Sequence, residues 1–375
     1  MNFDLSVLWA NILELFQGDG WKMIVMWIIG GVLIFLAIKK EMEPTLLLPM
    51  GFGAILVNLP NSGATEVIDH LFEIGINSHE LFPLILFIGI GAMIDFEPLL
   101  TNPKLMLFGA AAQFGIFFTL CASSLIGFDL KDAASIAIIG AADGPTSIFV
   151  ANMLNSNYTA AIMVAAYSYM ALVPVVQPPI IKLCTTKKER MIRMDYKGRK
   201  VSKLTKILFP IVVTVIVGLV AHDAVALIGF LMFGNLIREC GVLNSLSETA
   251  QKVLANLITI FLGITIASQM TADSFLRVET LVIIALGLVA FTFDTFAGVM
   301  LAKVMNLFTK KKINPMIGAA GISAFPMSAR VVHKMGLEAD NQNFLLMHSI
   351  GVNVSGQVAS VIAGGLLLSF VQSVL

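Results

Sequence analysis

One acidic residue, Asp143, lies inside an apolar stretch, within the run Gly140-Ala-Ala-Asp-Gly-Pro-Thr146. An ionisable side chain at membrane depth is costly to bury, so such a residue is a candidate binding group. Gly144 tolerates unusual dihedrals and Pro145 has no amide hydrogen, so a helix should break here and free backbone carbonyls. A carboxylate with backbone oxygens suits a small hard cation such as Na⁺. A simple Asp-Gly turn is the alternative.

Neutral oxygen donors that could complete such a site occur in the second half of the chain. Asn314 precedes Pro315, and Ser323 and Asn353 lie in apolar surroundings. Amide and hydroxyl oxygens are acceptable ligands for a hard cation. Asn314 could instead cap a helix, and the other two could form hydrogen bonds between membrane helices.

Three further ionisable residues could take part in chemistry. The Arg330 guanidinium suits bidentate binding of a carboxylate, although it could also be a basic flank of a membrane segment. Asp294 is a second acid inside an apparent span, and could belong to a second cation site or reach solvent. His348 could relay a proton, or could simply pack or cap a helix.

The composition indicates a protein that crosses the membrane several times. Of 375 residues, 57% are hydrophobic and 13% charged, and the mean hydropathy is +0.89, which excludes an ordinary soluble domain. Helices are the default for apolar runs of this length. We predict an all-α polytopic membrane protein with about ten transmembrane helices. The main runs are Trp21 to Ile38, Lys104 to Ile126, Tyr158 to Leu183, Ile207 to Ala221 and Leu345 to Phe370.

A basic linker, residues 185–206, divides the chain and has nine basic and two acidic residues, a net charge of +7. The positive-inside rule places this linker in the cytoplasm. It separates a first membrane repeat, residues 21–184, from a second, residues 207–375. Residues 1–20 lack the basic start and cleavage site of a signal peptide, so we expect an interfacial amphipathic helix there.

Short motifs recur in the two halves in the same order. Phe87-Ile-Gly-Ile90 resembles Phe261-Leu-Gly-Ile264 at an offset of 174 residues, and Gly140-Ala-Ala142 resembles Gly318-Ala-Ala320 at an offset of 178. Both Gly-Ala-Ala elements precede a break that contains proline. Paired interruptions at corresponding positions are typical of transporters built from repeats.

The charges of the loops indicate that the two repeats are inverted. Loops near residues 60–80 and 127–132 are acidic, whereas residues 303–312, which match the second of these loops, contain four lysines. If residues 133–155 form a re-entrant hairpin, the acidic loops face outside and the lysines inside, as inverted repeats require. One broken or re-entrant hairpin then enters from each side, and their tips meet near the midplane.

Five long motifs give the chain a family resemblance from about Gly30 to the C-terminus. It resembles the β subunit of the biotin-dependent, Na⁺-pumping decarboxylases, which act on oxaloacetate, methylmalonyl-CoA, glutaconyl-CoA or malonate. The motifs are Leu46-Leu-Leu-Pro-Met-Gly-Phe-Gly53, Gly140-Ala-Ala-Asp-Gly-Pro-Thr146, Tyr169-Met-Ala-Leu-Val-Pro174, Asn314-Pro-Met-Ile-Gly-Ala-Ala-Gly-Ile-Ser323 and Met347-His-Ser-Ile-Gly-Val-Asn-Val-Ser-Gly356, with Pro326 and Arg330.

The resemblance implies roles for particular residues of this chain. It implies that Na⁺ is bound by a set that includes Asp143, and that Asp143, Tyr169 and Arg330 take part in decarboxylation and coupling. Arg330 would also bind carboxybiotin. The implied Na⁺ ligands are Asp143, Asn314, Gly318, Ser323 and Asn353.

The resemblance also implies a primary sodium pump that decarboxylates carboxybiotin, moves Na⁺ outward and consumes a proton. The expected partners are a carboxyltransferase subunit, a biotin carrier protein and a small γ or δ membrane subunit, with more than one copy of this chain in a bacterial inner membrane. No biotin-attachment motif is present, so carboxybiotin would come from the carrier, and we expect no nucleic acid partner. From the residues alone, a stand-alone Na⁺/carboxylate or Na⁺/H⁺ carrier fits equally well. A non-transporting scaffold would leave Asp143 and both breaks unexplained.

Overall fold

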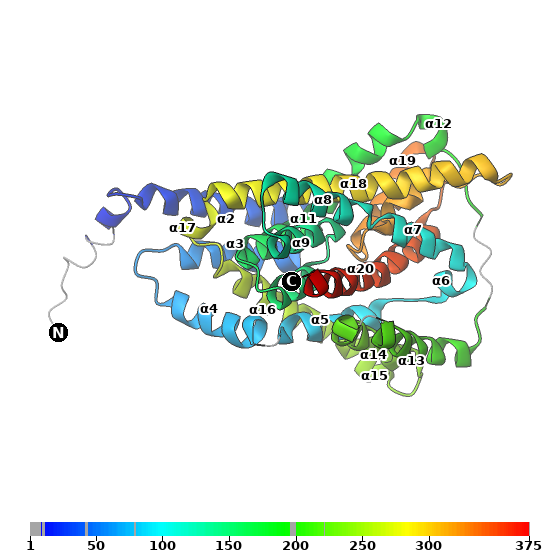
Figure 1. Cartoon of the computed structure of the whole chain (residues 1–375), viewed down its shortest axis with the longest axis horizontal. Helices are drawn as coiled ribbons and strands as arrows, with labels where there is room; N and C mark the ends of the chain where they lie inside the picture. Colours follow the sequence, from blue (N-terminus) through cyan, green and yellow to red (C-terminus); the bar gives the residue numbers. More distant parts are fainter. Residues whose placement is uncertain are drawn as a thin grey trace.

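The computed structural model describes residue 9 and residues 12–41, 44–78, 80–195, 200–220 and 222–374. Within these ranges every regular element is helical, which confirms the expected all-α class. Of the helix expected in residues 1–20, residues 1–8, 10 and 11 lie outside the described residues. Figure 1 shows α4 and α17 toward the end of the molecule that carries the N-terminus, and α6 and α12 toward the opposite end.

The helices follow the division made by the basic linker. Before it lie α2 (Gly20–Lys40), α3 (Pro44–Val57), α4 (Ala64–Phe72), α5 (Leu81–Met93), α6 (Glu97–Thr101), α7 (Met106–Ala111), α8 (Phe114–Ile126), α9 (Leu130–Ala137), α10 (Gly144–Met153) and α11 (Thr159–Cys184). Within and after it lie α12 (Lys187–Arg190), α13 (Lys203–Val220), α14 (Val225–Glu239), α15 (Asn244–Thr249), α16 (Ala255–Ala267), α17 (Ala272–Phe275), α18 (Val278–Phe308), α19 (Met327–Ala339) and α20 (Leu346–Val374). Two 3₁₀ segments, η3 (Ile138–Ala141) and η6 (Pro315–Gly321), lead into the two breaks.

Six helical stretches of the described chain are long and apolar enough to cross a membrane, or seven if one bent pair counts as a span. The expected number of about ten is therefore not confirmed by length and composition. The reason is that several apolar helices are short: α3 has 14 residues and α5 has 13. A straight helix needs about 20 residues to cross the hydrocarbon core.

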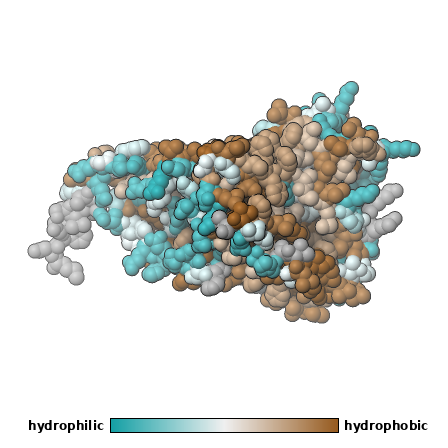
Figure 2. Space-filling view, in the orientation of Figure 1, coloured by the Kyte–Doolittle hydropathy of each residue, from teal (hydrophilic) through white to brown (hydrophobic). Residues whose placement is uncertain are grey.

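The outer surface is apolar, as expected for a protein solvated by lipid. Large side chains such as Leu183 and Leu219 are 89% and 83% exposed. Figure 2 shows hydrophobic residues over much of the visible face. Apolar surface on this scale marks a membrane or protein interface rather than a surface in water.

Small residues let the backbones of two helix pairs approach closely. In the pair α5 and α14, a Cβ at Gly91 would overlap the carbonyl of Leu231. In the pair α3 and α16, a Cβ at Gly53 would lie 2.6 Å from the Cβ of Ala267. Close packing through small residues is the usual way in which helices associate in membranes.

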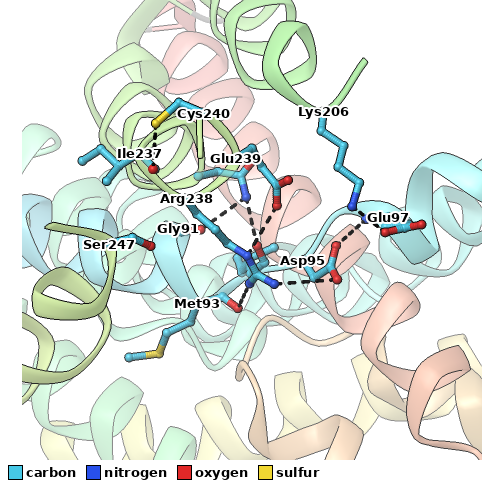
Figure 3. A network of polar contacts seen from close by, with 12 residues as sticks. Gly91, Met93, Asp95, Glu97, Lys206, Ile237, Arg238, Glu239, Cys240 and Ser247 are labelled. Atoms are coloured by element: carbon cyan, nitrogen blue, oxygen red, sulfur yellow. Dashed lines mark hydrogen bonds and ion pairs between the residues drawn. The ribbon is translucent and has the colours of Figure 1, made fainter. Parts of the chain in front are cut away.

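Polar contacts near the basic linker join α5 and α6 to α13 and α14, as Figure 3 shows. Arg238 Nη1 donates to the carbonyl of Met93 at 2.7 Å and Nη2 lies 3.7 Å from Asp95. Lys206 forms an ion pair with Glu97. These contacts hold the end of α5 on the side of the molecule that carries the basic linker.

Candidate functional site

The first break places Asp143 at the start of a helix. The segment η3 ends at Ala142, whose φ of 51° is left-handed, and Asp143 is the N-cap of α10. Its carboxylate accepts the backbone amide of Thr146 at 3.4 Å and the Thr146 hydroxyl at 2.8 Å. Aspartate is a preferred N-cap because its side chain accepts the unpaired amides of the first turn. The turn predicted from Gly144 and Pro145 is thus confirmed, with the acid facing inward.

Helix α20 supplies the remaining donors to Asp143. Gln357 Nε2 donates to Oδ2 at 3.1 Å and Ser360 Oγ at 2.9 Å. The residue is only 3% exposed, and no described basic side chain forms an ion pair with it. Neutral donors stabilise a buried carboxylate but leave its charge uncompensated, so the site favours a cation.

The two breaks are in direct contact. Ser323, in the second break, donates from both its hydroxyl and its amide to the carbonyl of Ala141 in the first, at 2.7 and 3.1 Å. Asn353 of α20 donates to the carbonyl of Ile322 at 2.7 Å, while its own Oδ1 is buried with no partner in the described chain. Asp143 and Ser323 therefore line the same cavity, and Asn353 contacts the residue that precedes Ser323.

A cavity of about 150 Å³ opens beside Asp143. This volume accommodates a few water molecules or a partly hydrated ion. Its polar lining comes from both breaks and from α3, α11, α16 and α20. The lining includes Thr45, Asp143, Tyr167, Asn256, Thr259, Ser323 and Gln357. The carboxylate is thus buried yet faces a space that a small ion could enter.

Asn314 and Gly318 support the second break and do not contact Asp143. Asn314 caps η6 by accepting the amide of Met316 at 3.1 Å, and donates to the carbonyls of Arg190 and Ile192, both at 2.9 Å. It therefore joins the hairpin to the basic linker. Gly318 faces Gly298 of α18 so closely that a Cβ on either would overlap the other's carbonyl.

Tyr169 and Arg330 lie outside the contacts of the carboxylate. The Tyr169 hydroxyl donates to the carbonyl of Ile284, and its ring stacks on Phe291 with centroids 6.5 Å apart. Arg330 is exposed in the first turn of α19, and no hydrogen bond or ion pair of its guanidinium is found within the described residues. It lies one turn past Pro326, which lines the cavity.

The second acid, Asp294, is fully buried in α18 and lies behind the first break. It accepts the amide of Gly115, and a Cβ at Gly140 would lie 2.8 Å from its Oδ2. That Oδ2 has no hydrogen-bond partner in the described chain. Asp294 therefore packs against the same 3₁₀ segment that leads to Asp143.

His348 lines a second cavity of about 230 Å³, to which the basic linker contributes Met194 and Asp195. Lysines dominate its charged lining, with a single acid, Asp195. The three lysines are Lys104, Lys311 and Lys312. Such a lining favours an anion.

Four residues of the site were missed by reasoning from the sequence. Gln357 and Ser360 follow Asn353 by four and seven positions, which places all three on one face of a helix. That spacing could have revealed them. Thr146 could have been found as the partner of an N-cap. Tyr167 gave no distinguishing signal, because Tyr169 lies nearby in the same helix.

The apolar spans and a buried acidic group at the contact of two interrupted helices, beside a small cavity, define a helical multi-pass membrane protein with a polar interior site. Within that class, the chain belongs to the family described as the Na⁺-transporting oxaloacetate decarboxylase beta subunit, whose model matches residues 22–371.

Relatives with curated names align over nearly the whole chain. The methylmalonyl-CoA decarboxylase subunit beta of Propionigenium modestum is 48% identical over 94% of this chain and 96% of its own length. The oxaloacetate decarboxylase beta chain of Haemophilus ducreyi is 44% identical over 97% of this chain and 100% of its own length. The corresponding methylmalonyl-CoA decarboxylase subunit of Veillonella parvula is 48% identical over 93% of each.

Proposed function

We propose that this chain is the membrane subunit of a sodium pump, which decarboxylates carboxybiotin on a partner carrier and moves Na⁺ outward. The observation that carries the proposal is Asp143, a buried carboxylate with neutral donors and an adjacent cavity. Its family membership supports the same reading. Carboxyltransferase, biotin carrier and small γ or δ subunits complete the complex, which holds more than one copy of this chain in a bacterial inner membrane.

The Na⁺ site is formed where the two breaks touch. Asp143 supplies the negative charge, and Ser323 and Asn353 supply neutral oxygens. The unpartnered Oδ1 of Asn353 supports this assignment, since a buried acceptor without a donor is suited to a cation. Asn314 and Gly318 act by holding the second break in place.

Decarboxylation requires a proton, which couples it to Na⁺. When the bond between the biotin nitrogen and the carboxylate carbon breaks, CO₂ leaves and the nitrogen takes up one proton. Na⁺ and H⁺ compete for the Asp143 carboxylate, so arrival of Na⁺ releases a proton toward the biotin nitrogen. Arg330 orients the carboxylate of carboxybiotin. Tyr169 supports this step by fixing α11 against α18 through its bond to the carbonyl of Ile284. The lysine-lined cavity favours approach of this anion from the cytoplasm.

The membrane topology consists of ten crossings in two inverted repeats, with the basic linker, residues 185–206, in the cytoplasm. An offset of 174 residues relates α5 of the first half to α16 of the second. The packing of α5 on α14 and of α16 on α3 supports this arrangement, because each of these two related helices packs on a helix of the other half. Both pairs cross through glycines. Movement of the two hairpins against the remaining helices would give alternating access to the site.

The test is CO₂ release from the carboxylated biotin carrier by the purified complex, with and without Na⁺, combined with ²²Na⁺ uptake into proteoliposomes. We expect Asp143→Asn to abolish Na⁺-dependent turnover and uptake. Asp273→Asn is the matched control, because the side chain of Asp273 is 82% exposed. Substantial Na⁺-stimulated activity in Asp143→Asn would overturn the coupling scheme. Na⁺ uptake without carboxybiotin turnover would favour a stand-alone carrier.

A further inference from the structure

Three buried polar groups on the far side of the first break lack hydrogen-bond partners in the described chain. They are Glu80 Oε2, Asn152 Nδ2 and the hydroxyl of Tyr167. Buried polar atoms are nearly always paired, and each one left unpaired costs stability. Such groups at the edge of an ion site need an explanation, because apolar residues would pack there at lower cost.

Glu80 stands at the beginning of α5. It is only 6% exposed, and its φ of 55° places it in the left-handed region, which is uncommon for a residue other than glycine. The side chain of Asn152, in the last turn of α10, interacts with its carboxylate. No described basic side chain forms an ion pair with Glu80. A buried carboxyl group therefore lies between α5 and α10 with only a neutral neighbour.

Tyr167 connects this carboxylate with Asp143. Its ring lies against Gly144, where a Cβ would come within 2.5 Å of the ring, and it lines the cavity beside Asp143. The side chain is fully buried, and its hydroxyl lies within electrostatic range of both Asp143 and Glu80. The two acids thus share one polar neighbour in otherwise apolar surroundings.

The direction from Asp143 to Glu80 leads away from the basic linker. Asp143 caps the start of α10 and Asn152 lies near its end, about 13.5 Å along the helix at 1.5 Å per residue. In Figure 1, α4, which precedes Glu80, lies toward the end opposite α6 and α12. In the proposed topology this end faces the outside.

We propose that Glu80 is an outer cation-binding carboxylate that receives Na⁺ from Asp143 on its way out, with the Asn152 amide oxygen and the Tyr167 hydroxyl as neutral ligands. This inference rests on the proposed function, since it assumes that Na⁺ occupies Asp143. It accounts for the two unpaired acceptors, Glu80 Oε2 and the Tyr167 hydroxyl, because a passing cation would satisfy both. Glu80 belongs to the exit route and not to the first site.

The test uses the whole complex in proteoliposomes, with Na⁺ varied separately on the face that receives pumped Na⁺. Na⁺ on that face inhibits pumping by occupying the exit route. In Glu80→Gln the half-inhibitory concentration should rise about tenfold or more, the usual worth of a charged contact. Half-activation by Na⁺ on the cytoplasmic face should stay within about twofold, which also shows that the variant is folded. Glu66→Gln, at an exposed acid of α4, is the matched control.

The outcomes separate this inference from the proposed function. Wild-type complex without Na⁺ dependence would refute both. If Asp143→Asn is inactive but Glu80→Gln behaves like Glu66→Gln, the outer site is wrong and the function stands. Asn152→Leu, which removes a neutral ligand and no charge, should shift inhibition in the same direction by a smaller factor. An unchanged value in both Glu80→Gln and Asn152→Leu overturns the proposal.

Discussion

The two breaks use similar sequences but differ in what their polar groups do. In the first break a charged side chain, Asp143, is the acceptor for donors from its own helix and from α20. In the second break, side chains of neighbouring helices donate to backbone carbonyls. Gln177 of α11 donates to the carbonyl of Ala319 at 2.7 Å, and Asn353 to that of Ile322. Only the first break therefore carries a charge.

Each break also accepts a hydrogen bond from a glutamine of a neighbouring helix. Gln177 in α11 reaches the second break, and Gln357 in α20 reaches the first. They are 180 residues apart, near the offset of 178 that relates the Gly-Ala-Ala elements. Two helices, α11 and α20, thus each hold one break with the same residue type. In the proposed function, the first break binds the ion and the second break shapes the site around it.

The largest effect should come from adding a methyl group at the second break. In Gly318→Ala the new Cβ would overlap the carbonyl of Gly298, which is backbone and cannot rotate away. Overpacking costs about 1–3 kcal/mol or more when the neighbours are rigid. We expect little monodisperse protein in detergent. In Gly140→Ala the Cβ would meet the side chains of Ala290 and Asp294 at 2.7 and 2.8 Å, so the loss should be smaller.

Gly229→Ala is the control for the added methyl group, because its Cβ would have only Thr214 nearby, at 3.9 Å. Its yield and thermal midpoint should match those of the wild type. Equal losses for the Gly140 and Gly318 variants would show that the breaks do not differ in how tightly their backbones are packed.

A smaller effect should separate the two glutamines. In Gln357→Leu the ionised Asp143 loses a donor, and a hydrogen bond to a charged group is worth about 1.5–3 kcal/mol. Half-saturation by Na⁺ should therefore rise about tenfold or more. Gln177→Leu removes contacts to Ala319 and Ser328 instead, so it should lower the thermal midpoint and leave half-saturation within about twofold.

Na⁺ titration of CO₂ release measures half-saturation, and thermal unfolding in detergent measures the thermal midpoint. Ser360→Ala serves as a check, because it also removes a donor to Asp143 and should shift half-saturation in the same direction as Gln357→Leu. If Gln177→Leu raises the half-saturating Na⁺ concentration as much as Gln357→Leu does, the second break binds the ion directly.

Backbone chemistry made the breaks predictable from the sequence. Gly144 and Pro145 end one helix and start the next, and Asp143 caps it, as local rules require. Contact between the breaks was expected from the repeat pattern, and the bond from Ser323 to Ala141 confirms it. The number of spans was less accessible, since α3 and α5 are shorter than a full crossing, and hydropathy alone does not reveal how such helices are placed.

The directions in which side chains point were harder to predict from the sequence than the positions of the breaks. Tyr167 and Tyr169 are two residues apart in α11, so about 200° of rotation separates them, and the helix is buried on most sides. Burial on all sides removes the amphipathic pattern that would distinguish the faces. Asn314 was open between cap and ligand, and its Oδ1 accepts the Met316 amide as a cap does, while its Nδ2 donates to the carbonyl of Arg190. Its part in Na⁺ binding stays a proposal.

The smallest expected effect lies at the bases of the two hairpins. Asp132 closes the first by accepting from Ser156 and Asn157, whereas the second is closed by Arg193, whose Nη2 donates to Asp340 at 3.0 Å.

Arg193 holds the pKa of Asp340 below its usual 3.8. Because the folded pKa is the lower one, this pair stabilises the fold above about pH 4 and loses its contribution as pH falls through the lowered value. Asp340→Asn should therefore melt slightly earlier at pH 7 and equal the wild type at the acid limit, with Glu338→Gln unchanged throughout. Parallel curves for Asp340→Asn and wild type would show that the second hairpin does not depend on this ion pair.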